Sequence, residues 1–387
     1  MRLLTILLMS GLVGCAGAGA GSPGSSGTSA KTLASGSVLP SGSCATNSSN
    51  PGTGTSAASV LELLIERVPC RRSGRISYST TDDHGDQLGV LDPIEDPSRG
   101  YLGVYHSPYG LPAGSTAAGF RVSLARSYDL IHWHRIAILD PAGATEPVLF
   151  ALPRSRGYLL AYEKNDSASN HLVRIRYYSA LKHLLVGRFA AQLDLPRRYV
   201  IHNNGTPDIE SVAWHGSLAR SVINLTFHYE AGPGRRGPDR EAFGTVYGFR
   251  RWRSHTDRRV DQLLDSHGFR ASHGNVHEFS FANHRWRLYE AQTRLHDFAT
   301  WRVLLYDYST RRLRPLTLTT AHGSFRTSFG EPIAEVARAP SGSERVLIVT
   351  MFVFGTGQAA REGGELVYYQ PLRPHARTPA ARQHSWG

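Results

Sequence analysis

The chain has 387 residues, of which 41% are hydrophobic and 19% are charged, and its formal net charge is +12 at pH 7. This balance excludes a multispan membrane protein and a largely disordered chain, and the length suffices for one large domain or two ordinary ones. Forty of the 43 basic residues are arginines, scattered in pairs such as Arg71-Arg72 and Arg311-Arg312. Because a nucleic-acid footprint concentrates its basic residues in one stripe, we predict no nucleic-acid partner.

The first residues have the pattern of an export signal. Arg2 is followed by an apolar stretch over residues 3–13, which is too short to span a bilayer as a helix. The sequence Leu12-Val13-Gly14-Cys15 resembles the lipobox of bacterial lipoproteins. That resemblance implies a signal peptide over residues 1–14 and a lipid anchor at Cys15, so the protein would be exported and held on the membrane of the bacterial cell envelope. A plain secretory signal, with Cys15 there by chance, is the alternative.

Two segments precede the folded domain. Residues 15–58 are nearly all Gly, Ser, Ala, Thr and Pro, a composition typical of a flexible tether. Residues 59–74 begin with Ser-x-x-Glu, which is a capping-box signal and predicts a short docking helix. Cys44 and Cys70 flank that helix, and in an exported protein we expect them to form a disulfide. No Cys-x-x-Cys or Cys/His cluster indicates zinc, so we predict neither a metal nor a cofactor.

The main domain, residues 75–373, is predicted to be all-β. Short runs rich in β-branched and aromatic residues follow one another, separated by Gly, Pro, Asn and Asp, without a long helical period. The runs cover residues 101–105, 120–124, 157–162, 222–228, 286–289, 301–306 and 346–352. Residues 374–387 form a C-terminal tail.

A similar acidic opening precedes five of these runs. The acidic residues are Asp92, Glu146, Asp208, Glu278 and Glu331, at steps of 53 to 70 residues, which is close to the length of a four-stranded blade. We therefore predict a five-bladed β-propeller, a fold that protects its sheet edges by radial repetition. The five openings would then aim carboxylates at one mouth of the axial channel. Converging carboxylates are what acid/base cleavage of a glycosidic bond requires, whereas each Asp-Pro or Glu-Pro alone could be a simple turn signal.

The segment Ser127-Tyr-Asp129-Leu-Ile-His-Trp133 resembles a blade signature of the five-bladed furanosidase propellers, namely glycoside hydrolase family 43 and the related invertase and levansucrase families. In family 43 the first blade carries an Asp-Pro motif, matched by Asp92-Pro93. The second carries Trp-Ala-Pro, in whose place Glu146-Pro147 stands. The third carries an Asp, matched by Asp208, and the fourth carries Glu-Gly-Pro, to which His277-Glu278 is similar.

The resemblance implies an inverting hydrolase of furanosidic or related pentosyl linkages in a polysaccharide or oligosaccharide. Asp92 would be the general base, Glu278 the general acid and Asp208 the residue that keeps Glu278 protonated. Further sugar contacts are expected from Glu146, His277, Glu331 and Trp133.

Several alternatives remain open at this point. Glu210 lies two residues after Asp208 and could be the acid in place of Glu278. Asp82, Asp83 or Asp86 could be the base if the register of the first blade differs. A different class of function also fits the same pattern, namely an inactive propeller that binds a glycan or a protein without cleaving it.

Overall fold

The computed structural model describes most of the chain from residue 56 onward. The described residues are 56–66, 75–98, 100–109, 119–167, 170–197, 199, 204–232, 237–320, 328–354 and 361–372. The expected signal peptide, the lipid anchor at Cys15, the disulfide between Cys44 and Cys70 and the C-terminal tail lie outside these residues. Among the helices that are described, none has the length and apolar character needed to cross a membrane.

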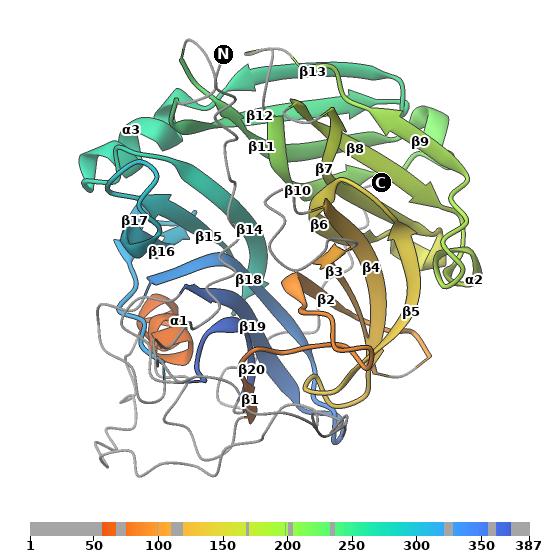
Figure 1. Cartoon of the computed structure of the whole chain (residues 1–387), viewed down its shortest axis with the longest axis horizontal. Coiled ribbons are helices and arrows are strands. Elements are labelled where there is room, and N and C mark those ends of the chain that lie inside the picture. Colours follow the sequence, from red (N-terminus) through yellow and green to blue (C-terminus); the bar gives the residue numbers. More distant parts are fainter. Residues whose placement is uncertain are drawn as a thin grey trace, which may run out of the picture.

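Five four-stranded antiparallel sheets surround one axis, as the ring of blades in Figure 1 shows. The all-β fold class and the five-bladed propeller are therefore confirmed. Blade 1 consists of β2 (Gly89–Glu95), β3 (Tyr101–Tyr109), β4 (Gly119–Ser127) and β5 (Trp133–Asp140). Blade 2 consists of β6 (Ala144–Ala151), β7 (Tyr158–Ser167), β8 (Asn170–Tyr178) and β9 (Ala191–Asp194). Blade 3 consists of β10 (Asn204–Ala213), β11 (Val222–Glu230), β12 (Asp239–Tyr247) and β13 (Arg251–Thr256). Blade 4 consists of β14 (His273–Phe281), β15 (His284–Gln292), β16 (Trp301–Asp307) and β17 (Arg312–Pro315). Blade 5 consists of β18 (Ser328–Arg338), β19 (Arg345–Phe354), β20 (Gly364–Pro371) and β1 (Arg75–Ser77).

The two ends of the folded domain close the ring together. The outermost strand of blade 5 is β1, which comes from the start of the domain and pairs antiparallel with β20, with Ile76 opposite Tyr368. A ring closed in this way cannot open at blade 5 without breaking strand pairing. In blades 1 to 4 the innermost strand is the first of the four in chain order. In blade 5 it is β18, because the earlier strand β1 lies at the outer edge.

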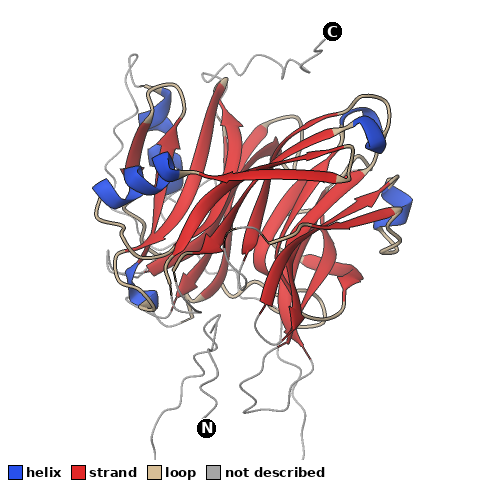
Figure 2. Ribbon diagram, turned by 90° about the horizontal axis from the view of Figure 1, so that it is seen from above, coloured by secondary structure: helices blue, strands red, loops and turns tan. Residues whose placement is uncertain are grey.

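The helices are short and lie at the periphery of the ring (Figure 2). They are α1 (Ala57–Glu66), α2 (Leu181–Leu184) and α3 (Arg258–Ser266), with single 3-10 turns at Pro153–Ser155, Leu218–Arg220 and Phe298–Thr300. The expected docking helix is α1, but its cap is Ser56, whose hydroxyl oxygen accepts from Ser59 N at 3.2 Å. Ser59 therefore lies inside the helix, which begins about one turn before the start that the capping-box pattern predicts.

Helix α1 is fixed to blades 4 and 5 by its apolar side and by its C-terminal end. Leu61, Leu64 and Ile65 are buried in one apolar cluster with side chains of β14, β15, β18 and β19. At the end of the helix, Tyr368 Oη and Gln370 Nε2 donate to the Ile65 and Leu64 carbonyls at 3.0 and 2.6 Å. These bonds satisfy carbonyl groups that the last helical turn leaves without partners.

The core consists of apolar layers between neighbouring blades, and Trp133 belongs to one of them. Its side chain is only 2% exposed, packs between blades 1 and 5, and donates from Nε1 to the Leu130 carbonyl at 3.1 Å. The sequence-based expectation that Trp133 contacts sugar is therefore corrected, because a ligand could reach it only by separating two blades.

The signature around Trp133 is a turn that ends β4 and starts β5. Ser127 Oγ accepts from Leu130 N at 2.8 Å, and Asp129 Oδ1 accepts from Ile131 N and His132 N at 2.9 and 2.8 Å. The serine and aspartate thus satisfy amides of the turn while the tryptophan anchors it in the core. The turn and its tryptophan anchor therefore explain the spacing of residues in this segment.

Candidate active site

Each innermost strand contains a bulge near its start. The pairing register with the second strand shifts between Gly89 and Asp92 in β2 and between Gly330 and Ile333 in β18, and at the matching place in β6, β10 and β14. The bulge residue has a positive φ in four blades: Val90 (51°), Glu146 (50°), Thr206 (45°) and Glu331 (53°); in β14 the corresponding residue is Gly274. Because the bulge recurs at the same place in all five blades, it is a regular feature of the fold. It turns the side chains of the innermost strands toward the axis.

The bulges show that the five acidic residues do not occupy equivalent positions. Glu146 and Glu331 are bulge residues, Asp92 and Asp208 lie two residues after the bulge residue, and Glu278 lies four residues after it. The expectation of one ring of five carboxylates is therefore wrong. Instead the carboxylates divide into three groups at different depths along the strands.

The first group consists of Glu146 and Glu331, which we call the bulge pair. Oxygen atoms of both carboxyl groups and a nitrogen of His106 on β3 all lie within 4.8 Å of one another. One oxygen of each glutamate, Oε2, is buried and has no hydrogen-bond partner among the described residues. The bulge pair thus brings together two carboxyl groups from blades 2 and 5, each with a buried oxygen that has no partner among the described residues.

Burial and mutual repulsion keep protons on the bulge pair. Burial, with Glu290 adding to it, raises the pKa of Glu331 to about 8. Burial also raises the pKa of Glu146 well above its usual value, and the nearby carboxylates of Glu331, Glu163, Glu290 and Glu365 raise it further. Because two close carboxylates resist ionising together, the pair holds at least one proton at neutral pH.

His106 beside the bulge pair is a neutral imidazole. Its Nδ1 accepts a hydrogen bond from Glu146 N at 3.2 Å, and burial lowers its pKa to about 4. Its other nitrogen, Nε2, faces the backbone of β2, where a Cβ at Gly89 would approach it to 2.6 Å. Both nitrogens therefore face the protein rather than an open site.

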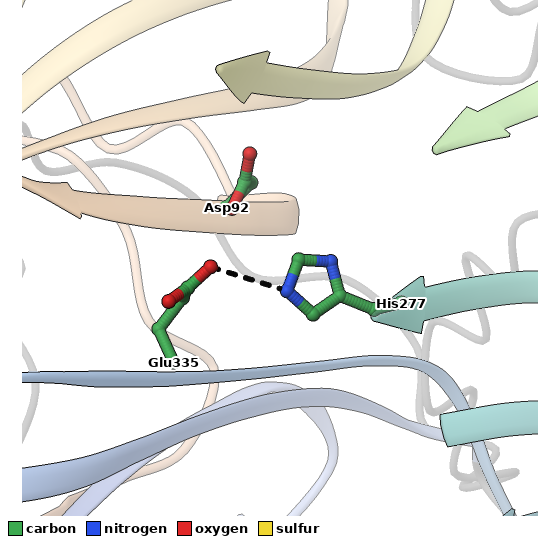
Figure 3. A group of neighbouring side chains, drawn as sticks. All are labelled: Asp92, His277 and Glu335. Atoms are coloured by element: carbon green, nitrogen blue, oxygen red, sulfur yellow. Dashed lines mark ion pairs between the residues drawn. The ribbon is translucent and has the colours of Figure 1, made fainter. Parts of the chain in front are cut away.

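The second group consists of Asp92, Asp208, His277 and Glu335, which we call the histidine cluster. His277 Nδ1 lies 3.6 Å from Asp208 Oδ1, and Nε2 lies 3.4 Å from Glu335 Oε1. Figure 3 shows Asp92, His277 and Glu335 beside one another on β2, β14 and β18, with Glu335 reaching toward His277. The two aspartates are also tied to the next blade, since Asp92 Oδ2 accepts from Leu149 N at 2.6 Å and Asp208 Oδ2 accepts from Glu278 N at 3.0 Å.

The histidine cluster supplies its own cation. Burial alone would lower the pKa of His277, but Glu335, Asp208 and Asp92 outweigh it and raise that pKa to about 9. Burial raises the pKa of Asp92 to about 7, although the positive charge of His277 opposes the rise. The imidazolium therefore lies among three carboxyl groups, and this balanced arrangement differs from the cation-free bulge pair.

The histidine cluster is also the better of two places for a metal ion. One oxygen or nitrogen each of Asp92, His277 and Glu335 lie within 4.8 Å of one another, as do those of the bulge pair and His106. In the cluster, Asp208 approaches Nδ1 of His277 and Nε2 points to Glu335, so a metal at Nε2 would have to displace the proton of the imidazolium. In the bulge pair, both His106 nitrogens face the protein.

The third group consists of Glu278 and its ion-pair partners. Glu278 Oε1 accepts from Arg285 Nε at 2.8 Å, and its Oε2 accepts from Tyr308 Oη at 2.7 Å and from Arg287 Nη2 at 3.1 Å. Glu210 forms an ion pair with the same Arg287. The side chains of His277 and Glu278 point to opposite faces of β14, as neighbours on a strand do. Glu278 and its alternative Glu210 thus belong to an ion-pair network between blades 3 and 4. This network adjoins the histidine cluster at Asp208, because the charge of Arg287 lowers the pKa of Asp208 and that of Glu278 raises it.

The alternative bases in the first blade are also engaged elsewhere. Asp82 accepts from His84 N and Asp86 N, both at 2.9 Å, and from Tyr105 Oη at 2.6 Å. Asp86 pairs with Arg121 and Arg135. Asp83 accepts from Arg135 N at 2.9 Å. These residues order the segment beside β5, where Asp82 bridges to Trp133, and β5 is the outermost strand of its blade.

Several residues of the site were missed by the sequence analysis. His106, Glu290 and Glu365 lie on second or third strands of their blades, whereas the search for acidic openings covered only first strands. Glu335 lies on a first strand but beyond its opening. A usable signal was the glycine before the bulge residue, as in Gly205-Thr206 and Gly330-Glu331, which aligns blades 3 and 5 correctly.

Comparison with known proteins shows the fold and leaves the family open. No protein-family model matches the sequence, and no curated protein matches it. A solved structure described as a "Glycoside hydrolase" is similar at a TM-score of 0.53 and 9% identity, over 82% of this protein and 95% of the other. A thermostable family-43 glycoside hydrolase aligns at 0.48 and 12%, over 76% and 93%. A family-43 enzyme from Xanthomonas citri, solved with xylotriose, aligns at 0.46 and 10%, over 82% and 93%. The protein therefore has a five-bladed propeller fold found in glycoside hydrolases.

Proposed function

We propose that the protein is a glycoside hydrolase whose acid and base are the two glutamates of the bulge pair. The observation that carries the proposal is the convergence of Glu146 and Glu331, each with a buried oxygen that has no partner among the described residues, at the axis of a propeller. A pair of carboxyl groups that holds one proton is the equipment that cleavage of a glycosidic bond requires. The fold shared with glycoside hydrolases supports the same reaction class.

In this proposal Glu331 protonates the leaving oxygen and Glu146 acts at the anomeric carbon from the other side. Burial raises the pKa of Glu331 to about 8 and that of Glu146 well above its usual value, so the assignment of Glu331 as the acid is part of the proposal. An inverting mechanism needs carboxyl groups about 6.5–9.5 Å apart, whereas a retaining one needs about 5–5.5 Å. Oxygens of the bulge pair lie within 4.8 Å of each other, which favours retention through a glycosyl-enzyme intermediate over the inversion implied by the family resemblance.

The substrate proposed is a furanosidic or related pentosyl linkage in a polysaccharide or oligosaccharide. This part rests on the sequence resemblance to the furanosidase propellers alone. Export and a lipid anchor at Cys15 would place the enzyme where such polymers are met, and both rest on the lipobox resemblance alone.

The alternative is a propeller that binds a glycan without cleaving it, and one observation favours it. In blades 2, 3 and 5 the proline follows the bulge residue directly, as in Thr206-Pro207, whereas Pro93 stands three residues after Val90. If the Asp-Pro motif of family 43 occupies the bulge, this protein has Val90 and Thr206 at the two positions where the family has carboxylates. Asp92, the base expected from the sequence, then does not correspond to the family's base, because it lies two residues after the bulge position.

Activity measurements separate the two functions. Native protein is assayed on aryl furanosides, aryl pyranosides and pentose polysaccharides, beside Glu331→Gln and Glu278→Gln. We expect cleavage by the native protein and a loss of kcat/KM in Glu331→Gln of about 10²- to 10⁴-fold, because a positioned proton donor is removed. Glu278→Gln is the matched control and should stay within about threefold of native activity, since it removes no proton donor from the bulge pair. Equal turnover in native protein and Glu331→Gln would refute the bulge pair as the acid/base machinery, and binding without cleavage by native protein would favour the binding module.

A further inference from the structure

Four of the five junctions between blades share a hydrogen bond that the proposed chemistry does not use. At each, a buried side chain of one blade accepts from a backbone amide at the bulge of the next blade. His106 accepts from Glu146 N, Glu163 from Thr206 N, Glu290 from Glu331 N, and Glu365 from Leu91 N. The junction between blades 3 and 4 differs, because there Arg240 donates to the Ala271 and Arg270 carbonyls.

The sequence makes room for these acceptors by omitting side chains. A Cβ at Gly330 would lie 2.5 Å from Glu290 Oε2, and a Cβ at Gly205 would collide with Glu163 Oε2. Both glycines directly precede a bulge residue with positive φ, Glu331 and Thr206 respectively. The carboxylate therefore fills the space of a missing side chain and holds the amide of the strained residue that follows.

Glu290 holds both strands that it lies between. Besides the bond from Glu331 N in blade 5, its Oε1 accepts from Asn275 N of its own blade at 2.9 Å. It is 7% exposed, and burial raises its pKa to about 7 although the two amide donors oppose the rise. Its position relative to the backbone of Glu331 is therefore fixed from two sides.

We propose that Glu290 is a positioning residue for the acid Glu331, and that His106 does the same for Glu146. Glu290 holds the left-handed backbone that points Glu331 at the axis, and its negative charge raises the proton affinity of the Glu331 carboxyl group. His106 holds the amide of Glu146 while remaining neutral, so it fixes position without adding charge. This assignment rests on the proposed function, since it names what holds the same two carboxyl groups.

The charged groups that act most strongly on the bulge pair are carboxylates, and one of them, Glu163, is itself paired with His171. Glu290 comes from β15, Glu163 from β7 and Glu365 from β20, and His106 comes from β3. Asp239 at the start of β12 acts on Glu290 in turn. Glu290 is the neighbour that acts on Glu331 most strongly after burial, so its charge is the one to remove in a test.

The test compares Glu290→Gln, Glu290→Leu and the buried control Glu241→Gln in the whole protein. The glutamine keeps an acceptor for the amides and loses the charge, whereas the leucine loses both. The first readout is the titration of the Glu331 carboxyl carbon in ¹³C-labelled protein, assigned by its absence in Glu331→Gln. We expect the midpoint to fall by about one pH unit in Glu290→Gln, because a like charge is removed, and to stay unchanged in Glu241→Gln.

The second readout is the pH profile of kcat/KM. In Glu290→Gln the alkaline limb should move to lower pH by the same amount with kcat retained, whereas Glu290→Leu should lose about 100-fold in kcat because the acid is misplaced. His106→Leu should lose a similar factor without moving the alkaline limb. An unmoved Glu331 midpoint in Glu290→Gln would overturn the proposal even if Glu290→Leu fails to fold. The titration needs no turnover, so it tests the role of Glu290 even if no substrate is cleaved. Absence of cleavage would count against the proposed function and not against the role of Glu290.

Discussion

The bulge pair and the histidine cluster each bring buried carboxyl groups from different blades to the propeller axis, but they balance the charge differently. In the histidine cluster, His277 lies 3.6 Å from Asp208 and 3.4 Å from Glu335. Its positive charge therefore compensates part of the negative charge of the carboxylates. In the bulge pair the nearest histidine is neutral, and two glutamate oxygens have no partner among the described residues. Buried charges that are paired support structure, whereas buried carboxyl groups with raised pKa values and free oxygens are typical of sites that do chemistry.

The comparison also separates the roles of neighbouring residues on one strand. In β14, His277 faces the axis, and Glu278 faces Arg285, Arg287 and Tyr308 on the other side. A motif that reads as one unit in sequence thus contributes to two different networks. Each network can be broken separately, which gives the following predictions in order of decreasing effect.

His277→Leu should lower the free energy of unfolding by about 3–5 kcal/mol, because it leaves the buried carboxyl groups of Asp92 and Asp208 without their cation. His106→Leu removes one amide acceptor and no charge, and should cost about 1–3 kcal/mol. Both are measured by chemical denaturation at pH 7. Equal costs for the two variants would mean that His277 is not the charge that holds the cluster.

Glu331→Gln should flatten the fall of stability with rising pH. The pKa of Glu331 is raised to about 8 from a usual value of 4.5, so the folded state keeps a proton that the unfolded state has lost between these pH values. Stability therefore falls across that window, by about 1 kcal/mol per pH unit from this group. The slope between pH 5 and 8, from denaturation curves of native and variant protein, checks this, and parallel slopes would contradict it.

Glu278→Gln should cost about 1–2 kcal/mol of stability, since one acceptor of a charged network becomes neutral. Arg287 keeps its ion pair with Glu210 in this variant, which limits the loss. The alkaline limb of the activity profile should stay in place. A lost or shifted limb would restore Glu278 as the acid expected from the family resemblance.

Glu95→Gln measures how much stability is lost when a carboxylate outside the bulge pair and the histidine cluster is neutralised. Glu95 pairs with Arg338 and Arg345 across blades 1 and 5, where the side chains of both arginines are largely exposed. We expect a loss below about 1 kcal/mol, which salt should reduce further. A loss as large as that of His277→Leu would remove the distinction between axial and peripheral charge.

The number and order of the blades could be predicted from the sequence because the acidic openings and hydrophobic runs repeat. The runs at 101–105 and 346–352 are parts of β3 and β19, the second strands of their sheets. Aromatic and β-branched residues fit such buried strands, so local composition carried this information.

The register of the site could not be predicted because two similar dipeptides sit differently on the bulge. Asp92-Pro93 and Glu146-Pro147 read alike, yet Glu146 is the bulge residue and Asp92 lies two residues beyond it. A bulge changes which face later side chains take, and sequence alone does not show where it falls. Cross-blade partners such as Glu290 depend on packing between sheets, which no pattern within one blade reveals.

A crystal structure of Glu331→Gln with a bound pentose oligosaccharide tests the central claim most directly. The account predicts a glycosidic oxygen within hydrogen-bond reach of the residue-331 amide, with the carboxyl group of Glu146 facing the anomeric carbon. A sugar bound against Glu278 and Arg285, or on the rim of a blade away from the axis, would contradict it.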